Sequence, residues 1–258
     1  MKSLTLEHAS FWYPATQSAA LRDVSLDVAQ GEVVALVGAL GAGASTLLLV
    51  AADLAPRVTG GRLEGSVGRR DRSGIVLPTP WTQLSGMAFT VWDEVAFGPA
   101  NLGWPAHEIA RRVDRALDQL EVVPLASRDP ATLSGGELQR VIIAAILAMD
   151  PGLVLLDEPA AELDAEGART LLRLVRVLAR EGKAIVLATS AVDTLPDVAD
   201  RVVWLEDGAV RAVGTPDLLA DVAACEAGLG TSVATVWRAG DLPGPYPLTV
   251  AHAVRRWR

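Results

Sequence analysis

Apolar and polar residues alternate over the first thirty residues of the chain, which is the pattern of strands with one buried face. The alternation is interrupted at Pro14–Gln17, a stretch typical of a turn. We therefore expect antiparallel strands on either side of this turn. The apolar positions that carry the alternation are Leu4, Leu6, Leu21, Val24, Leu26 and Val28.

From residue 33 onward, short continuous apolar runs replace the alternation, and such runs are typical of strands buried on both faces. They lie at 33–37, 153–156, 184–188 and 202–205, with a further short strand expected at Gly74–Leu77. Helical spacing predicts helices over Thr46–Ala52, after Thr90, over Pro105–Val123, after Ser134 and over Ala168–Glu181. This order of strands and helices predicts an α/β fold with an antiparallel β subdomain and a helical subdomain at about residues 80–150.

Composition narrows the classes of protein that fit. Half of the 258 residues are apolar and the mean hydropathy is +0.30. No window approaches the roughly 18 uninterrupted apolar residues of a membrane span. The single Cys225 excludes an internal disulfide, and Met1–Glu7 lacks the apolar core of a signal peptide, so we expect a cytoplasmic chain. A net charge of −8 argues against nucleic-acid binding, and the basic end Arg255–Arg258 is interpreted as a solvated helix end.

We expect the main domain to cover residues 1–220 and a small C-terminal extension to cover 221–258. Glycine and proline are frequent in the last forty residues, and Thr249 is expected to cap a short terminal helix.

A glycine-rich loop follows the first continuous apolar run. It fits the pattern G-x-x-x-x-G-K-[ST] except that Ala44 stands where the lysine belongs. A strand, such a loop and a helix together present backbone N–H groups and a helix N-terminus to a polyphosphate. We expect ATP contacts at Gly38, Gly41, Gly43, Ala44, Ser45 and Thr46.

The apolar run at 153–156 ends in two carboxylates, Asp157 and Glu158. A carboxylate at a buried strand end, opposite a loop serine, is a typical ligand of Mg²⁺ on a nucleoside triphosphate, so Asp157 and Ser45 are the expected metal ligands. Glu158 is the expected catalytic residue, because the next carboxylate can orient or deprotonate the attacking water. The alternative is a strand that simply runs into a turn.

A second candidate anion site opens the helix after Leu133. Ser134, Gly135 and Gly136 supply a hydroxyl, close backbone approach and a helix N-terminus, and Glu137 follows them. The alternative is a plain helix cap preceded by a glycine turn.

With these motifs the chain resembles the nucleotide-binding subunits of ABC transporters over about residues 4–220. The resemblance implies that Leu133–Arg140 is the signature motif, that Asp157-Glu158 ends Walker B, and that Ala161–Asp164 is the D-loop, with Glu162 where glycine is usual. It also implies that Tyr13 stacks on adenine; a core or turn tyrosine is the alternative.

A narrower resemblance is to the ATPases of energy-coupling factor transporters, which serve vitamin or metal uptake. It rests on Val91–Gly103 and on Pro245–Val250.

Three residues depart from the family pattern, and all three stand at positions that serve the γ-phosphate or its metal. The loop lysine is Ala44, the family glutamine falls on Pro78, and the family's switch histidine falls on Ser190. Each change removes a donor or ligand aimed at the γ-phosphate or its metal, and proline lacks even a backbone N–H. Drift in a lysine-poor composition is the alternative for Ala44 alone. The three together predict a degenerate nucleotide site.

The family works as a face-to-face dimer in which each ATP lies between the loop of one subunit and the signature of the other. The resemblance therefore implies ATP and Mg²⁺ as cofactors, and a heterodimer with a competent second ATPase subunit. It also implies integral membrane transporter subunits as partners at the cytoplasmic face of the membrane. The alternatives are a nucleotide-binding scaffold without hydrolysis, or a soluble, non-transport member of the superfamily.

In this family the coupling helices of the membrane partner dock between the 74–77 strand and the helical segment. We expect a groove for such a helix, lined by Trp81, Leu84, Met87 and Phe89. The alternative is that these residues are ordinary core.

Overall fold

The computed structural model describes residues 1–240, 242 and 246–257. Pro245, the first residue of the C-terminal motif, and Arg258, the last residue of the basic end, lie outside the described residues.

A six-stranded sheet forms the centre of the molecule, in the order β5-β6-β7-β3-β8-β9. The continuous apolar runs are its central strands, as predicted, and their residues are buried on both faces. Neighbours are parallel except β9, which pairs antiparallel with β8. The strands are β3 (Val33–Val37), β5 (Ser73–Val76), β6 (Leu153–Asp157), β7 (Ala184–Ala188), β8 (Arg201–Glu206) and β9 (Ala209–Gly214).

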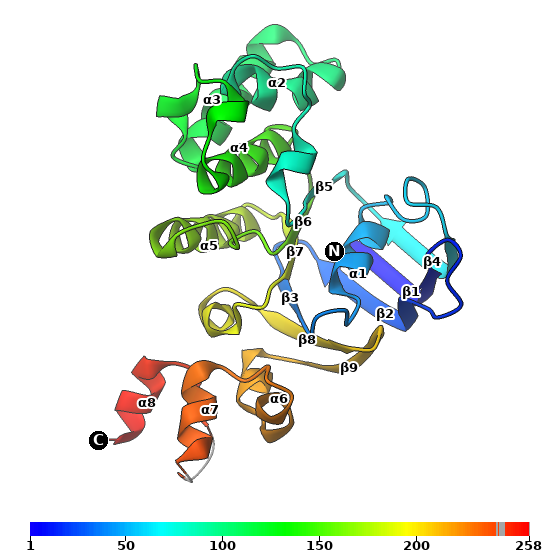
Figure 1. The fold of residues 1–258 in the computed structure, drawn as a ribbon, viewed down its shortest axis with the longest axis vertical. Helices are drawn as coiled ribbons and strands as arrows, with labels where there is room; N and C mark the ends of the chain where they lie inside the picture. Colours follow the sequence, from blue (N-terminus) through cyan, green and yellow to red (C-terminus); the bar gives the residue numbers. More distant parts are fainter. Residues whose placement is uncertain (241, 243–245, 258) are drawn as a thin grey trace.

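A smaller antiparallel sheet, in the order β2-β1-β4, lies beside the central one (Figure 1). Its strands are β1 (Lys2–Trp12), β2 (Leu21–Ala29) and β4 (Arg62–Arg69). The pair β1 and β2 confirms the antiparallel strands expected from the alternation. We did not predict β4, because this edge strand is largely exposed and carries no apolar pattern.

Each central strand sends alternate side chains into two separate cores. Val34 and Leu36 of β3 pack with the antiparallel sheet and with helix α1 (Ala44–Ala51). Val33, Ala35 and Val37 belong to the other core, which contains residues of α5 (Ala165–Arg180) and of the helical part. Because both faces of the sheet are covered, the strand ends are left as the place where loops form a site.

The helical part stands at one end of the molecule (Figure 1). It contains α2 (Val91–Asn101), α3 (Ala106–Gln119) and α4 (Gly135–Ala148), and Thr90 and Ser134 cap α2 and α4. Short 3₁₀ helices lie at η1 (Pro80–Gln83), η2 (Val123–Leu125), η3 (Pro130–Thr132), η4 (Val192–Asp197) and η5 (Pro216–Ala220).

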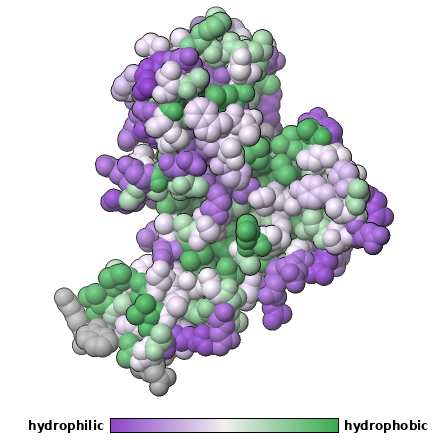
Figure 2. Space-filling view, in the orientation of Figure 1, coloured by the Kyte–Doolittle hydropathy of each residue, from purple (hydrophilic) through white to green (hydrophobic). Residues whose placement is uncertain are grey.

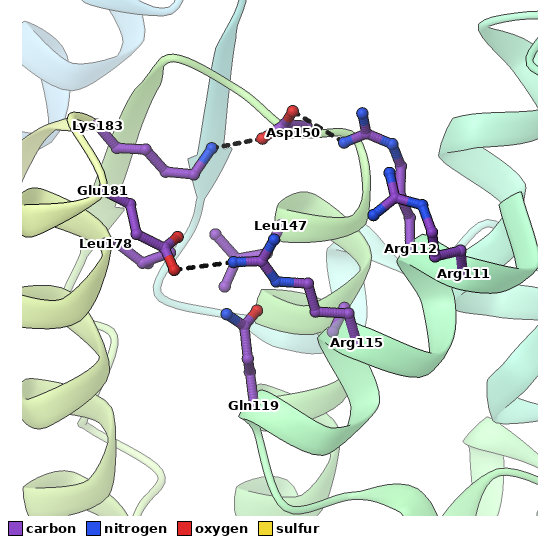
Figure 3. Close-up of a pocket in the computed structure, with 10 residues that line it drawn as sticks. Arg111, Arg112, Arg115, Gln119, Leu147, Asp150, Leu178, Glu181 and Lys183 are labelled. Atoms are coloured by element: carbon purple, nitrogen blue, oxygen red, sulfur yellow. Dashed lines mark hydrogen bonds and ion pairs between the residues drawn. The ribbon is translucent and has the colours of Figure 1, made fainter. Parts of the chain in front are cut away.

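Ion pairs join the helical part to the central sheet (Figure 3). Asp150, just after α4, receives Nη1 of Arg112 on α3 at 2.8 Å and Nζ of Lys183 at 2.6 Å. Arg115 on α3 reaches Glu181, at the end of α5, at 2.8 Å. Burial alone would raise the pKa of the Asp150 carboxyl, but the hydrogen bonds from Lys183 and Arg112 outweigh it and lower the pKa to about 2.

Three short helices follow the central sheet, α6 (Val222–Glu226), α7 (Ser232–Ala239) and α8 (Val250–Trp257). Thr249 precedes α8, and its hydroxyl accepts a hydrogen bond from the backbone N–H of His252 at 3.2 Å. This is the cap expected from the sequence. Within the described ranges, no helix combines the length and apolarity needed to cross a membrane.

Candidate functional site

The glycine-rich loop connects β3 to α1 in a shape that only glycine accommodates well. Gly41 and Gly43 have φ of 85° and 105°, values that L side chains disfavour. A β-carbon on Gly38 would lie 2.5 Å from the carbonyl oxygen of Leu205, so this glycine is also required for packing against β8. The loop therefore keeps its backbone form for reasons that do not depend on the missing lysine.

The loop, the ends of the neighbouring strands and the three positions that depart from the family pattern line a single cavity of about 480 Å³, which we call the loop pocket. Its lining consists of Ala20, Leu36, Gly38–Thr46, Pro78, Asp157, Glu158 and Ala188–Ser190. The structure thus brings together every predicted ATP, metal and catalytic residue except Tyr13. None of these lining residues is a lysine, arginine or histidine, while two are acidic.

Asp157 is 3% exposed at the end of β6. Burial raises the pKa of its carboxyl, a hydrogen bond from Ser45 lowers it, and the charge of Glu158 raises it further, so the pKa stands above its ordinary value. A buried carboxylate beside a hydroxyl offers the hard oxygen ligands that Mg²⁺ takes when phosphates supply others. In the part of the chain that the structure describes, no group of three or more acidic, histidine or cysteine side chains is placed to hold a metal by itself.

Glu158 is held by the loop that follows β7. The backbone N–H of Ser190 donates to Oε1 of Glu158 at 2.7 Å, and the Thr189 hydroxyl donates to Oε2 at 3.3 Å. Thus the predicted catalytic carboxylate is oriented by a backbone amide and a hydroxyl at the place where the family has histidine. Sequence reasoning missed Thr189, although a hydroxyl residue directly after β7 is a visible signal.

Pro78 follows β5 and lines the loop pocket without a donor. The nearest glutamine in sequence, Gln83, does not replace the family glutamine. Its Nε2 donates to the carbonyl of Ile75 at 3.0 Å, and its Oε1 accepts from the N–H of Leu77 at 2.7 Å. Its amide is therefore engaged with the backbone around β5.

Tyr13 lies beside the loop but outside the loop pocket. Its hydroxyl is hydrogen-bonded to Oγ1 of Thr46 at 3.2 Å, and its ring packs edge-on against Phe11 with centroids 4.9 Å apart. Next to it, the guanidinium of Arg62 lies 4.1 Å from the centroid of the Trp12 ring. The stacking of Tyr13 on adenine stays a prediction.

Ser134–Glu137 open α4 as a reciprocal cap. The Glu137 carboxylate accepts from the Ser134 N–H at 2.8 Å and from its hydroxyl at 2.9 Å. These two bonds, backbone first, lower the pKa of Glu137. The four residues line a second cavity of about 530 Å³, the signature face, whose other lining residues are Glu121, Arg140, Glu162–Asp164, Glu166, Gly167 and Thr170. The two predicted anion sites are therefore separate on one chain.

The predicted groove residues differ in exposure. Trp81, Met87 and Phe89 are 47%, 72% and 87% exposed, so they are not core. Leu84 is half-buried against the core of the helical part, as the core alternative expects. Hydrophobic residues also gather in the hollow between the helical part and the antiparallel sheet (Figure 2).

Comparison with known proteins agrees with this geometry. Residues 21–161 match the family model described as ABC transporter. The chain is 39% identical to the energy-coupling factor transporter ATP-binding protein EcfA1 of Lacticaseibacillus paracasei, over 83% of this chain and 79% of that protein.

Two solved structures share the fold. One is cbiO1 of Clostridium perfringens, part of the ABC transporter complex cbiONQ, with a TM-score of 0.75, 27% identity, and coverage of 93% of this chain and 99% of that one. The other is a dimeric ATP-binding cassette bound to ADP and Pi, with a TM-score of 0.72, 26% identity, and coverage of 83% and 98%.

Proposed function

Because the chain belongs to the family of ABC transporter ATP-binding proteins, we propose that it is the degenerate half of a heterodimeric ATPase. In this proposal a competent second ATPase subunit and integral membrane subunits complete the transporter. The complex couples ATP hydrolysis to uptake of a small nutrient, with this chain at the cytoplasmic face of the membrane.

The observation that carries the proposal is the composition of the loop pocket. Ala44, Pro78 and Ser190 all line it, so the three departures fall on one site and not at scattered positions. A tetra-anionic nucleotide would meet backbone N–H groups and hydroxyls there but no side-chain cation. Losing one preorganised donor typically costs about 10²–10³ in rate, so losing three leaves little hydrolysis.

The signature face keeps the complete motif Ser134–Glu137 at the start of α4. When the chain pairs with a subunit whose loop is intact, this motif and the partner's loop make one complete site, while the loop pocket makes the degenerate one. Two copies of this chain would make two degenerate sites. This asymmetry favours a heterodimer.

In the loop pocket, Ser45 and Asp157 would hold Mg²⁺ on a bound nucleotide. The metal would neutralise phosphate charge in place of the absent lysine. We therefore propose that nucleotide binding at this pocket depends strongly on Mg²⁺.

Trp81, Met87 and Phe89 supply an exposed apolar surface for a helix of the membrane subunit. Trp81→Glu should release the membrane subunit while the melting temperature of the free chain stays within about 2 °C, as for an exposed site. Leu84→Glu is the matched control, because Leu84 packs against the core and its replacement should lower the melting temperature clearly.

The decisive experiment is purification of the complex through a tag on this chain. We expect equimolar recovery of a second ATPase subunit with an intact G-x-x-x-x-G-K-[ST] loop, together with a membrane subunit. An active homodimer of this chain that hydrolyses ATP at its own loop pocket would contradict the proposal.

A further inference from the structure

A carboxylate lies against the glycines of the signature face. A β-carbon built on Gly135 would lie 2.7 Å from Oε2 of Glu162 and 3.5 Å from its Cδ. A β-carbon built on Gly136 would lie 2.9 Å from the backbone carbonyl oxygen of Glu162. The side chain and the main chain of one residue therefore place oxygen atoms over both glycines.

These two glycines form the first turn of α4, a helix of 14 residues. The free N–H groups and the positive end of such a helix attract a negative group. Among the described residues, no hydrogen bond or ion pair holds the Glu162 carboxylate elsewhere, and the residue is exposed. Its carboxylate is therefore free to be displaced from its place over Gly135.

The rest of the signature face adds to the negative charge. Glu121 and Glu166 also line the cavity, and Arg140 is the only basic residue of the lining. Glu137 and Asp164 are engaged in capping α4 and α5. An anion that approaches Gly135 thus meets carboxylates that have no partner among the described residues, and Glu162 is the one that lies against the glycine.

We propose that Glu162 is an internal competitor for the anion site of the signature face. Its carboxylate occupies the space over Gly135 until a nucleotide phosphate carried by the partner subunit displaces it. The inference rests on the proposed function, because the partner's ATP is the anion concerned. Its consequence is that Glu162 raises the ATP concentration at which the two subunits close on each other.

The isolated full chain tests the competition directly. Inorganic phosphate is titrated against the chain while the backbone amide resonances of Gly135 and Gly136 are followed by NMR. Glu162→Gln should lower the phosphate concentration for half-maximal shift by about fivefold, the effect of one unit charge about 4 Å away in a water-like dielectric. Glu162→Ala should do the same, because it too removes the charge.

Glu166→Gln is the matched control. It removes the same charge from the same cavity. However, none of the three atoms nearest to a β-carbon on Gly135 or on Gly136 belongs to Glu166. We expect it to change the phosphate concentration by less than about twofold, since exposed charges farther away are screened. If Glu162→Gln and Glu166→Gln change the phosphate concentration equally, the inference is overturned, because the overall negative charge of the cavity would then explain both effects. No shift with either Glu162 variant would also overturn it.

The assembled complex separates this inference from the proposed function. Glu162→Gln should lower the KM for ATP with little change in kcat, whereas Gly135→Asp should abolish hydrolysis. If Gly135→Asp abolishes hydrolysis but Glu162→Gln changes neither KM nor phosphate binding, only the inference fails. If Glu162→Gln tightens phosphate binding but Gly135→Asp leaves hydrolysis intact, the proposed function fails and the competition stands.

Discussion

The loop pocket and the signature face both present backbone N–H groups at the start of a helix, and they have diverged in opposite ways. The loop pocket lacks side-chain cations, because Ala44, Pro78 and Ser190 offer no charged donor. The signature face has the complete motif together with a side chain over it, the carboxylate of Glu162 against Gly135. In our proposals, the absence of side-chain cations weakens the loop pocket, and the Glu162 carboxylate shields the signature face.

This difference shows that the backbone form and the charge of an anion site change independently. Gly38 and Gly43 would clash with the carbonyl oxygens of Leu205 and Ala20 if they carried a β-carbon, so the fold itself retains them. No comparable packing requirement holds a lysine at position 44. A glycine-rich loop is therefore evidence of the fold, whereas the residue at the lysine position is evidence of the chemistry.

The largest expected effect ranks the two sites within the assembled complex. Gly135→Asp places a further side chain and negative charge at the first turn of α4, and we expect it to abolish most ATP hydrolysis and transport because it blocks the complete site. Glu158→Gln should leave most of both, since in our proposal the loop pocket contributes little hydrolysis. ATP hydrolysis and substrate uptake by the two variant complexes are the measurements. The opposite ranking would make the loop pocket the working site.

The next effect concerns the loop pocket in isolation. The purified chain should hydrolyse ATP at or near background, because no lining side chain neutralises the γ-phosphate. Steady-state ATPase assays with Mg²⁺ measure this. A turnover on the order of one per second, close to typical enzyme turnover, that disappears in Glu158→Gln would show that Glu158, as held by Ser190 and Thr189, is sufficient for hydrolysis.

Nucleotide affinity should respond more modestly. Ala44→Lys should tighten ATP binding roughly 10–100-fold, the value of one charged hydrogen bond of about 1.5–3 kcal/mol. Leu40→Lys is the matched control, because it adds the same charge to the same loop at a fully exposed position that is not the lysine position of the motif. Calorimetry with ATP and Mg²⁺ compares them. Equal tightening by both lysines would mean that charge alone, and not the shape of the loop, governs binding.

The smallest expected effect concerns Asp150, which lies beyond the end of α4 that is opposite the signature face. The pKa of Asp150 is lowered to about 2, below the ordinary 3.8, so its ion pairs stabilise the fold fully above about pH 4 and lose this effect as pH falls towards 2. Asp150→Asn should remove that part of the acid sensitivity. The change in melting temperature at pH 7 should be below about 4 °C, because half-exposed ion pairs contribute about 1 kcal/mol or less.

Thermal melts at pH 7 and pH 3 measure this effect. The affinity of the loop pocket for ATP is the second measurement. ATP affinity should be the same in Asp150→Asn and the native chain, since Asp150 does not line that pocket. A loss of ATP affinity in Asp150→Asn would show that the ion pairs of Asp150 are coupled to the loop pocket through the sheet.

The sequence predicted the central strands because a strand buried on both faces must be apolar throughout. It did not predict β4 and β9, whose residues are half-buried or exposed at sheet edges and follow no apolar pattern. The order of the motifs along the chain was enough to predict that the glycine-rich loop and the carboxylates at the end of β6 line one pocket. The contact between Glu162 and Gly135 did not, because it depends on how the loop after β6 folds against the start of α4, which no local pattern encodes.

The ion pairs of α3 and Asp150 also have a mechanical consequence. Helix α4 is a rod of 14 residues, about 21 Å long, with Gly135 at one end and Asp150 just beyond the other. Arg112 and Arg115 tie α3 to the rest of the molecule at two points one turn apart, and two points of attachment resist twisting as well as separation. At its far end from Gly135, this rod is therefore connected through Asp150 and Lys183 to the start of β7.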